Sequence, residues 1–119
     1  MGKMLIKNLR FKSRHGYHDF ERVVGNLFEV DIEFEIELAP AGESDNLDDT
    51  LDYSKACAIV EDVMNSEPVL LIETLLAQIG DQLMEEYPQI QKLEVRLRKL
   101  APPMETVCDY VEISDQWQR

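Results

Sequence analysis

The segment Leu27–Leu38 alternates more strictly than any other part of the chain. Every even-numbered residue from Phe28 to Leu38 is apolar, and the opposite positions carry Glu29, Asp31, Glu33, Glu35 and Glu37. Because successive side chains of a strand point to opposite faces, this pattern predicts a long strand with one apolar and one acidic face. Neighbouring acids on that face lie about 6.8 Å apart and repel by roughly 0.6 kcal/mol in water. The acidic face therefore needs either solvent or basic partners on a neighbouring strand.

Other segments with strand or helix periodicity complete the predicted fold. Strands are expected at about 3–12, 91–99 and 107–114, and helices at about 53–65 and 69–87. Asp52 or Ser54 can cap the first helix, and Pro88 ends the second. Residues 13–26 are expected to form a long turn, and residues 39–52 an acidic loop. The order ββααββ predicts one α+β domain over residues 1–119, with a four-stranded antiparallel sheet and two helices on one face.

Basic residues of the predicted third strand suit the acidic face of the second. Its polar positions include Lys92, Arg96 and Arg98. If the two strands pair, these cations face the carboxylates and turn repulsion into attraction. A simply solvated acidic face is the other interpretation.

The charge balance narrows the possible partners. The chain has 24 acidic and 12 basic residues and a formal net charge of −12, so nucleic acid and anionic membranes are not expected partners. No apolar run approaches the roughly 20 residues of a membrane span, and the first residues do not resemble a secretory signal. Cys57 and Cys108 are isolated, which suits reduced thiols of a cytoplasmic protein, although a disulfide between them stays open.

The edges of the predicted sheet favour assembly. A four-stranded sheet leaves two edges with unpaired backbone groups. Joining such edges between subunits into a closed barrel removes them. We therefore expect a homo-oligomer.

Lys99 is a candidate proton-transfer residue. It falls on the same face as Leu93, Val95 and Leu97, and Ala101-Pro102-Pro103 follows it. An ammonium at the rim of an apolar face loses part of its hydration. The alternative is a lysine that merely extends to water from the end of a strand.

Glu73 and Tyr53 are candidates for ligand contacts. Glu73 lies in the apolar run Val69–Leu76 at a predicted helix start. It can bind two adjacent N–H donors of a pterin or guanine, or simply stabilise the helix start. Tyr53 begins the first predicted helix, where its hydroxyl can act as an acid or the ring can pack against the core.

A metal site is not expected. His15, His18 and Glu21 lie close in sequence, but the chain has only two histidines. No cysteine pair or His-Glu-x-x-His motif accompanies them. The acidic loop does not match a calcium-binding loop, and no glycine-rich phosphate loop occurs.

Five short motifs in this order resemble the dihydroneopterin aldolase family. They are His15-Gly16 with Glu21, Gly25-x-x-Phe28-x-Val30-Asp31, Asp45-Asn46-Leu47-x-x-Thr50-Leu51-Asp52-Tyr53, Leu71-Ile72-Glu73 and Lys99-Leu100-Ala101-Pro102-Pro103. The resemblance implies a tunnelling fold, in which four strands per subunit form an intersubunit barrel and two rings of four stack as an octamer. It also implies active sites at subunit interfaces.

The resemblance further implies a retro-aldol reaction of folate biosynthesis without metal, cofactor or Schiff base. The substrate, 7,8-dihydroneopterin, yields 6-hydroxymethyl-7,8-dihydropterin and glycolaldehyde. By resemblance, Lys99 transfers protons through water, Glu73 and the backbone of Ile72 bind the pterin, and Glu21 acts near the side-chain hydroxyls. Tyr53 comes from the adjacent subunit.

Two alternatives remain open from the sequence. The first is a 2′-epimerase of the same fold, to whose triphosphate-specific branch the segment Trp117-Gln118-Arg119 is similar. The second is a non-catalytic oligomer that binds a pterin or purine. Two departures from the family pattern are Arg14, where an aromatic residue is usual, and the glycine-free segment Met104–Val107.

Overall fold

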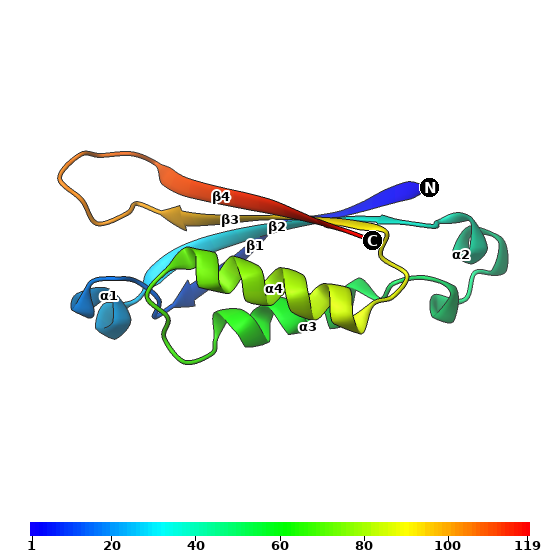
Figure 1. Ribbon diagram of the computed structural model, residues 1–119, viewed down its shortest axis with the longest axis horizontal. Helices are drawn as coiled ribbons and strands as arrows, with labels where there is room; N and C mark the ends of the chain where they lie inside the picture. Colours follow the sequence, from blue (N-terminus) through cyan, green and yellow to red (C-terminus); the bar gives the residue numbers. More distant parts are fainter.

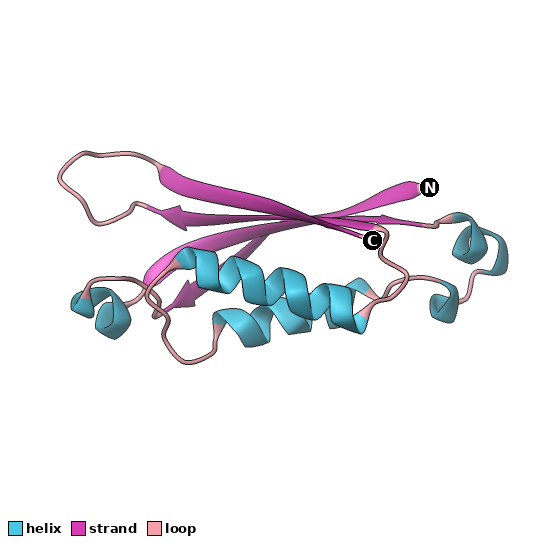
Figure 2. Cartoon of the chain, in the orientation of Figure 1, coloured by secondary structure: helices cyan, strands magenta, loops and turns pink.

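A computed structural model describes all residues from 1 to 119. The strands are β1 (Gly2–Ser13), β2 (Asn26–Ile36), β3 (Lys92–Leu100) and β4 (Tyr110–Gln118). The helices are α1 (Asp19–Val24), α2 (Ala39–Ser44), α3 (Tyr53–Met64) and α4 (Ile72–Glu86), with a 3₁₀ turn η1 (Leu47–Asp49). Figures 1 and 2 show two layers, a twisted sheet and the helix pair α3 and α4 on one of its faces.

The sheet is antiparallel throughout, in the order β1-β2-β3-β4, so β1 and β4 are its edges. The pairing of β1 with β2 shifts register between Ile6 and Leu9, and Asn8 there has a positive φ of 59°. This is a bulge, and it lets the backbone N–H of Asn8 turn toward β2 and donate to Asp31 Oδ1 at 2.8 Å.

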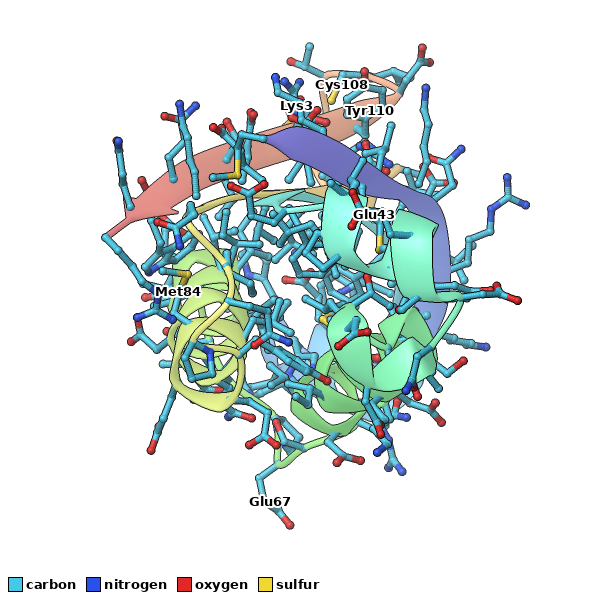
Figure 3. All side chains as sticks on the ribbon, turned by 90° about the vertical axis from the view of Figure 1, so that its right-hand side faces the viewer. Lys3, Glu43, Glu67, Met84, Cys108 and Tyr110 are labelled. Atoms are coloured by element: carbon cyan, nitrogen blue, oxygen red, sulfur yellow. The ribbon has the colours of Figure 1, made fainter.

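The core lies between the sheet and the two long helices. The even-numbered residues of β2 from Phe28 to Ile36 are buried, as the alternation predicts. The helices cover them with Ala56, Val60, Val63 and Met64 from α3, and with Leu75, Leu76, Ile79 and Leu83 from α4. Figure 3, a view along the long axis, shows side chains filling the space between the sheet and the helices. Burial of apolar surface on this face is the main stabilising term.

The other face of the sheet carries the predicted charge pairs. Glu29 lies opposite Arg98, and Asp31 lies opposite Arg96 in the β2–β3 register. The buried Arg98 guanidinium donates to both oxygens of Asp31 at 2.8 Å, and it also contacts Glu29 at 3.2 Å and Glu112 at 2.9 Å. The hydrogen bonds from Arg98 hold the pKa of Asp31 below its ordinary value, against the opposing effect of burial. Basic partners, rather than solvent alone, thus offset the acidic face.

Four predictions of local structure are wrong. The turn expected at 13–26 contains α1, and the loop expected at 39–52 contains α2 and η1. The predicted element order ββααββ therefore lacks two short helices and a 3₁₀ turn. The last strand begins at Tyr110 rather than 107, and Val107 is almost fully exposed in the preceding loop. The second long helix begins at Ile72, so Val69–Leu71 belong to the loop before it.

The segment Trp117–Arg119 closes the far end of α4. The Trp117 indole packs against Gly80, where an added Cβ would lie 2.0 Å from the ring, and its Nε1 donates to Asp81 at 3.1 Å. Arg119 donates to the carbonyls of Met84, Tyr87 and Ile90. The Met84 carbonyl lies in the last turn of α4, where no helical N–H is available to it, and the other two lie just beyond the helix. No helix has both the length and the apolar character that crossing a membrane requires.

Candidate functional site

Lys99 lies next to the last residue of β3, opposite Phe28 of β2 and Val111 of β4. Its side chain is 13% exposed, and its Nζ forms an ion pair with Glu21 Oε2. The chain leaves the strand through Ala101, which has a positive φ of 43° and whose N–H donates to Asp109 O at 2.9 Å. The β3–β4 pairing and this turn therefore hold Lys99 at the rim of the apolar face.

Glu21 is a buried carboxylate with three protein donors. It is 1% exposed and is the only buried residue of α1. Its Oε1 accepts from the backbone N–H of His18 at 3.2 Å, and its Oε2 accepts from Asn26 Nδ2 at 2.9 Å and from Lys99. Burial alone would raise the pKa of Glu21, but the hydrogen bonds from Lys99, His18 and Asn26 outweigh it, so the pKa lies below its ordinary value. Glu21 is thus held as an anion against Lys99.

The His15-Gly16 pair positions the segment that carries Glu21. His15 Nε2 lies 2.6 Å from Met64 O, and its Nδ1 accepts from the Val69 N–H at 3.1 Å. These partners identify the neutral tautomer with the proton on Nε2, which donates to Met64. Gly16 N–H donates to Val69 O at 2.9 Å, and a Cβ on Gly16 would lie 2.5–2.7 Å from the Glu21 side chain. The motif therefore ties the chain before α1 to the loop between α3 and α4, and only glycine leaves room for Glu21.

Ile72 and Glu73 form the first turn of α4. Glu73 is exposed and accepts no hydrogen bond from another side chain, while Ile72 packs at the edge of the core. The N-terminus of α4, the end of β3 and α1 lie at the same end of the molecule, at the left of Figure 1. The structure therefore brings Lys99 and Glu21 into contact and leaves Glu73 free at the same end.

Tyr53 lies elsewhere in the subunit. It is the first residue of α3, and its N-cap Asp52 accepts from the Ser54 N–H at 3.0 Å. Tyr53 is 59% exposed, so the expectation that its ring packs against the core is wrong. α3 begins at the end of the molecule where α2 lies and runs about 18 Å toward the Lys99 end. Tyr53 therefore does not meet Lys99 within one chain.

The groups able to bind a metal or act as a nucleophile are engaged or dispersed. Both ring nitrogens of His15 are used by backbone groups. No group of three His, Cys, Asp or Glu side chains is placed to hold a metal ion. Cys57 and Cys108 are free thiols, so the disulfide between them that the sequence allowed is absent. Burial raises the pKa of the Cys57 thiol. The chemistry that this end can support is proton transfer between Lys99 and a bound molecule.

The Lys99 end is exposed and partly apolar. The principal surface hollows, including one of about 540 Å³ beside Ser13 and residues 64–68, are lined by residues other than Lys99, Glu21 and Glu73. Large apolar side chains are instead exposed around the same end, from α1 and the loops beside it: Tyr17, Phe20, Val23, Val24, Leu70, Leu71, Met104 and Val107. None of these principal hollows encloses the ion pair of Lys99 with Glu21.

Sequence reasoning missed Asn26. Its amide donates to both Glu21 Oε2 and the His15 carbonyl, each at 2.9 Å. Its position after Gly25 inside one of the matched motifs was the only signal in the sequence.

Comparison with known proteins gives consistent matches. The family model described as FolB, dihydroneopterin aldolase, matches residues 4–115. A dihydroneopterin aldolase of Bacillus subtilis (strain 168) is 31% identical over 104 residues, which cover 87% of this chain and 87% of that protein. The structure of FolB from Vibrio cholerae O1 has a TM-score of 0.91 at 24% identity, covering 100% of this chain and 98% of that chain. Escherichia coli dihydroneopterin aldolase in complex with neopterin has a TM-score of 0.85 at 20% identity, covering 97% and 99%.

Proposed function

The chain belongs to the dihydroneopterin aldolase family, and from that premise we propose that it cleaves 7,8-dihydroneopterin with Lys99 as its proton-transfer residue. The observation that supports this assignment best is the ion pair of Lys99 with the buried Glu21. It lies at the end of the molecule where α4 presents an exposed carboxylate, Glu73. This combination offers a proton-transfer group and an anchor for a ring with adjacent N–H donors.

The proposed reaction is a retro-aldol cleavage. A proton leaves the 2′-hydroxyl, the C1′–C2′ bond breaks, and its electron pair passes into the N5=C6 imine of the pterin. Glycolaldehyde departs, and a proton returned to C1′ gives 6-hydroxymethyl-7,8-dihydropterin. Because the ring imine accepts the electrons, the cleavage requires neither a metal ion nor a Schiff base. The protein has to orient the ring and move protons, which Lys99 does through water.

The other residues have distinct proposed roles. Glu73 accepts two charge-assisted hydrogen bonds from the amino-pyrimidine edge, and the backbone of Ile72 adds a contact. Glu21 acts through Lys99, which it holds in place, since its own carboxylate is enclosed by protein donors. Tyr53 supplies its hydroxyl to the site of an adjacent subunit, because it cannot reach Lys99 in its own.

We also propose that the subunits assemble into a ring of four whose sheets form one barrel, with two rings stacked as an octamer. The unpaired edges of β1 and β4 and the apolar side chains exposed around the Lys99 end support this assembly. The two free cysteines suit a cytoplasmic location. The mass of the native particle tests the subunit count.

The decisive experiment incubates the protein with 7,8-dihydroneopterin and identifies the products by chromatography. Release of glycolaldehyde with 6-hydroxymethyl-7,8-dihydropterin supports the aldolase. Unchanged turnover after chelation, and no borohydride trapping of a lysine adduct, support independence from metal and Schiff base. Loss of turnover on chelation contradicts the metal-free route.

The two alternatives give different outcomes in the same assay. An epimerase yields the C2′ epimer without glycolaldehyde, and a pterin-binding protein yields no product. The segment Trp117–Arg119, whose similarity to the epimerase branch is only slight support for that activity, has a structural role at the end of α4. It therefore no longer distinguishes the two activities.

A further inference from the structure

Asn26 connects the two parts of the chain that enclose Glu21. It is the first residue of β2, paired with Ser13 of β1, and it is half-buried. Its Nδ2 donates to the carbonyl of His15, before α1, and to the carboxylate of Glu21, within α1, at 2.9 Å in both cases. The two hydrogens of one amide nitrogen thus join the loop before α1 to the Glu21 carboxylate.

The hydrogen bond to Glu21 falls on the oxygen that Lys99 uses. Oε2 accepts from both Asn26 and Lys99, while Oε1 accepts from the His18 N–H. A carboxylate that is 1% exposed, with Gly16 closely packed against it, has little freedom to turn. Asn26 therefore determines which edge of the carboxylate faces Lys99.

Building on the proposed aldolase function, we propose that Asn26 is a positioning residue of the reaction, which orients Glu21 and through it Lys99. Asn26 does not touch the substrate in this role. Its amide holds Oε2 in the place where the Lys99 ammonium is aimed at the reacting carbons. A positioning error of about 1 Å at a reacting group can lower the rate roughly 100-fold.

A purely structural role for Asn26 is the competing explanation, since the amide also binds the His15 carbonyl. The two explanations differ in the pH dependence. A hydrogen bond donated to an ionised carboxylate favours the ionised form, so the positioning role predicts that loss of the amide raises the pKa of Glu21. The charged and titratable groups around Glu21 are Lys99 on β3, Asp19 and Arg22 on α1, and His15 and His18 before it. None of these is altered by a substitution at position 26.

The test compares Asn26→Leu, which removes both donors at similar volume, with Asn26→Gln, which keeps the amide. We expect Asn26→Leu to lower kcat roughly 10–100-fold with little change in KM. The acidic limb of its kcat–pH profile should move up by roughly 0.5–1 pH unit, the range of one hydrogen bond. Asn26→Gln should recover much of both effects. Asn65→Leu, a change of the exposed residue after α3, is the matched control and should match the wild type.

A second measurement does not depend on turnover. The carbon-13 signal of the Glu21 carboxyl group, followed by NMR during a pH titration, should show a higher pKa in Asn26→Leu than in the wild type. If Asn26→Leu does not fold, the smaller Asn26→Ala serves in its place, and it should show an upward shift because it too lacks the amide donor and adds no charge.

The outcomes separate the two proposals. A wild type that does not cleave the pterin, with the NMR shift present, removes the aldolase assignment and leaves the placement of Glu21 by Asn26 intact. A wild type that cleaves the pterin while Asn26→Leu keeps its kcat, pH profile and Glu21 titration overturns the role of Asn26 alone. A lower kcat with an unchanged pH profile and titration also overturns it, in favour of the structural explanation.

Discussion

Lys99 is the residue whose removal tests the proposed chemistry most directly. We expect Lys99→Ala to lower kcat by about 10²–10⁴-fold, the usual contribution of a general acid–base group. The measurement is the steady-state rate of glycolaldehyde release. Lys92→Ala, at the start of the same strand and on its polar face, is the control and should keep kcat. Full turnover in Lys99→Ala would remove Lys99 from the mechanism.

Glu73 should affect binding rather than the chemical step. Hydrogen bonds to a charged group contribute about 1.5–3 kcal/mol, so Glu73→Ala should raise KM by about 10–150-fold. kcat should change much less, because the ion pair of Lys99 with Glu21, to which we assign the proton transfer, stays intact. Glu85→Ala, an exposed acid near the end of the same helix, controls for the loss of one negative charge. An unchanged KM in Glu73→Ala would contradict the anchor role.

At the scale of the sheet, Arg98 is the most connected charge. Replacing it by leucine leaves Asp31 buried without its partner, so we expect Arg98→Leu to lower the free energy of unfolding by about 3–5 kcal/mol. Arg96→Leu, on the same face but about half exposed, should cost less than about 1 kcal/mol. Denaturant unfolding at fixed protein concentration measures both. Equal losses in the two variants would show that burial of Arg98 does not matter.

The ion pair of Arg98 with Asp31 also predicts how the stability of the protein depends on pH. Because the pKa of Asp31 is lowered in the folded protein, its contribution is present above the ordinary carboxyl pKa and is lost as pH falls through the folded value. The free energy of unfolding should therefore decline below about pH 4 in the wild type. In Arg98→Leu this decline should become smaller, since an unpaired buried carboxyl no longer prefers to be ionised.

The hydrogen bonds of Arg119 stabilise the C-terminal end of α4. Arg119→Ala removes three donations to carbonyls at and beyond the end of the helix and one positive charge near its negative pole. We expect a loss of about 1 kcal/mol in the free energy of unfolding, because the side chain is exposed. Gln118→Ala, whose side chain makes no hydrogen bond, should have no effect. A drop in kcat without a loss of stability would instead assign Arg119 to the site.

The elements that the sequence predicts well are those whose burial sets their pattern. β2 alternates because one face is covered by α3 and α4, and the stripe of α4 repeats because Leu75, Ile79 and Leu83 contact the sheet. α1 has no such stripe, since its only buried residue is the polar Glu21, whose partners His18 and Asn26 flank the helix and whose partner Lys99 lies on β3. β4 begins late because the turn between Ala101 and Asp109 sets its register, and the alternation near Val107 does not carry that information.

At the scale of the whole molecule, the sequence offers candidate site residues but not the contacts between them. Lys99 stands out by its place on an apolar face, yet its contact with Glu21 spans most of the chain and depends on Asn26, Gly16 and the His15 bonds. Periodicity describes neighbours along an element, whereas these contacts come from chain segments that only the folded sheet brings together. For Tyr53 even the fold of one chain is not enough, because Tyr53 and Lys99 do not meet within a single subunit.

An interface site makes a quantitative prediction about mixed oligomers. Lys99→Ala and Tyr53→Phe should each be nearly inactive alone. In a ring assembled from equal amounts of both, an intact site needs one subunit with its lysine beside one with its tyrosine, which chance gives in about a quarter of interfaces. Co-refolded mixtures should therefore recover about a quarter of wild-type activity, whereas variants mixed without exchange should recover none. Lys92→Ala mixed with Lys99→Ala controls for simple dilution and should retain the half contributed by its intact sites. If co-refolding restores nothing while the mixed oligomers form, Lys99 and Tyr53 do not act across a subunit boundary.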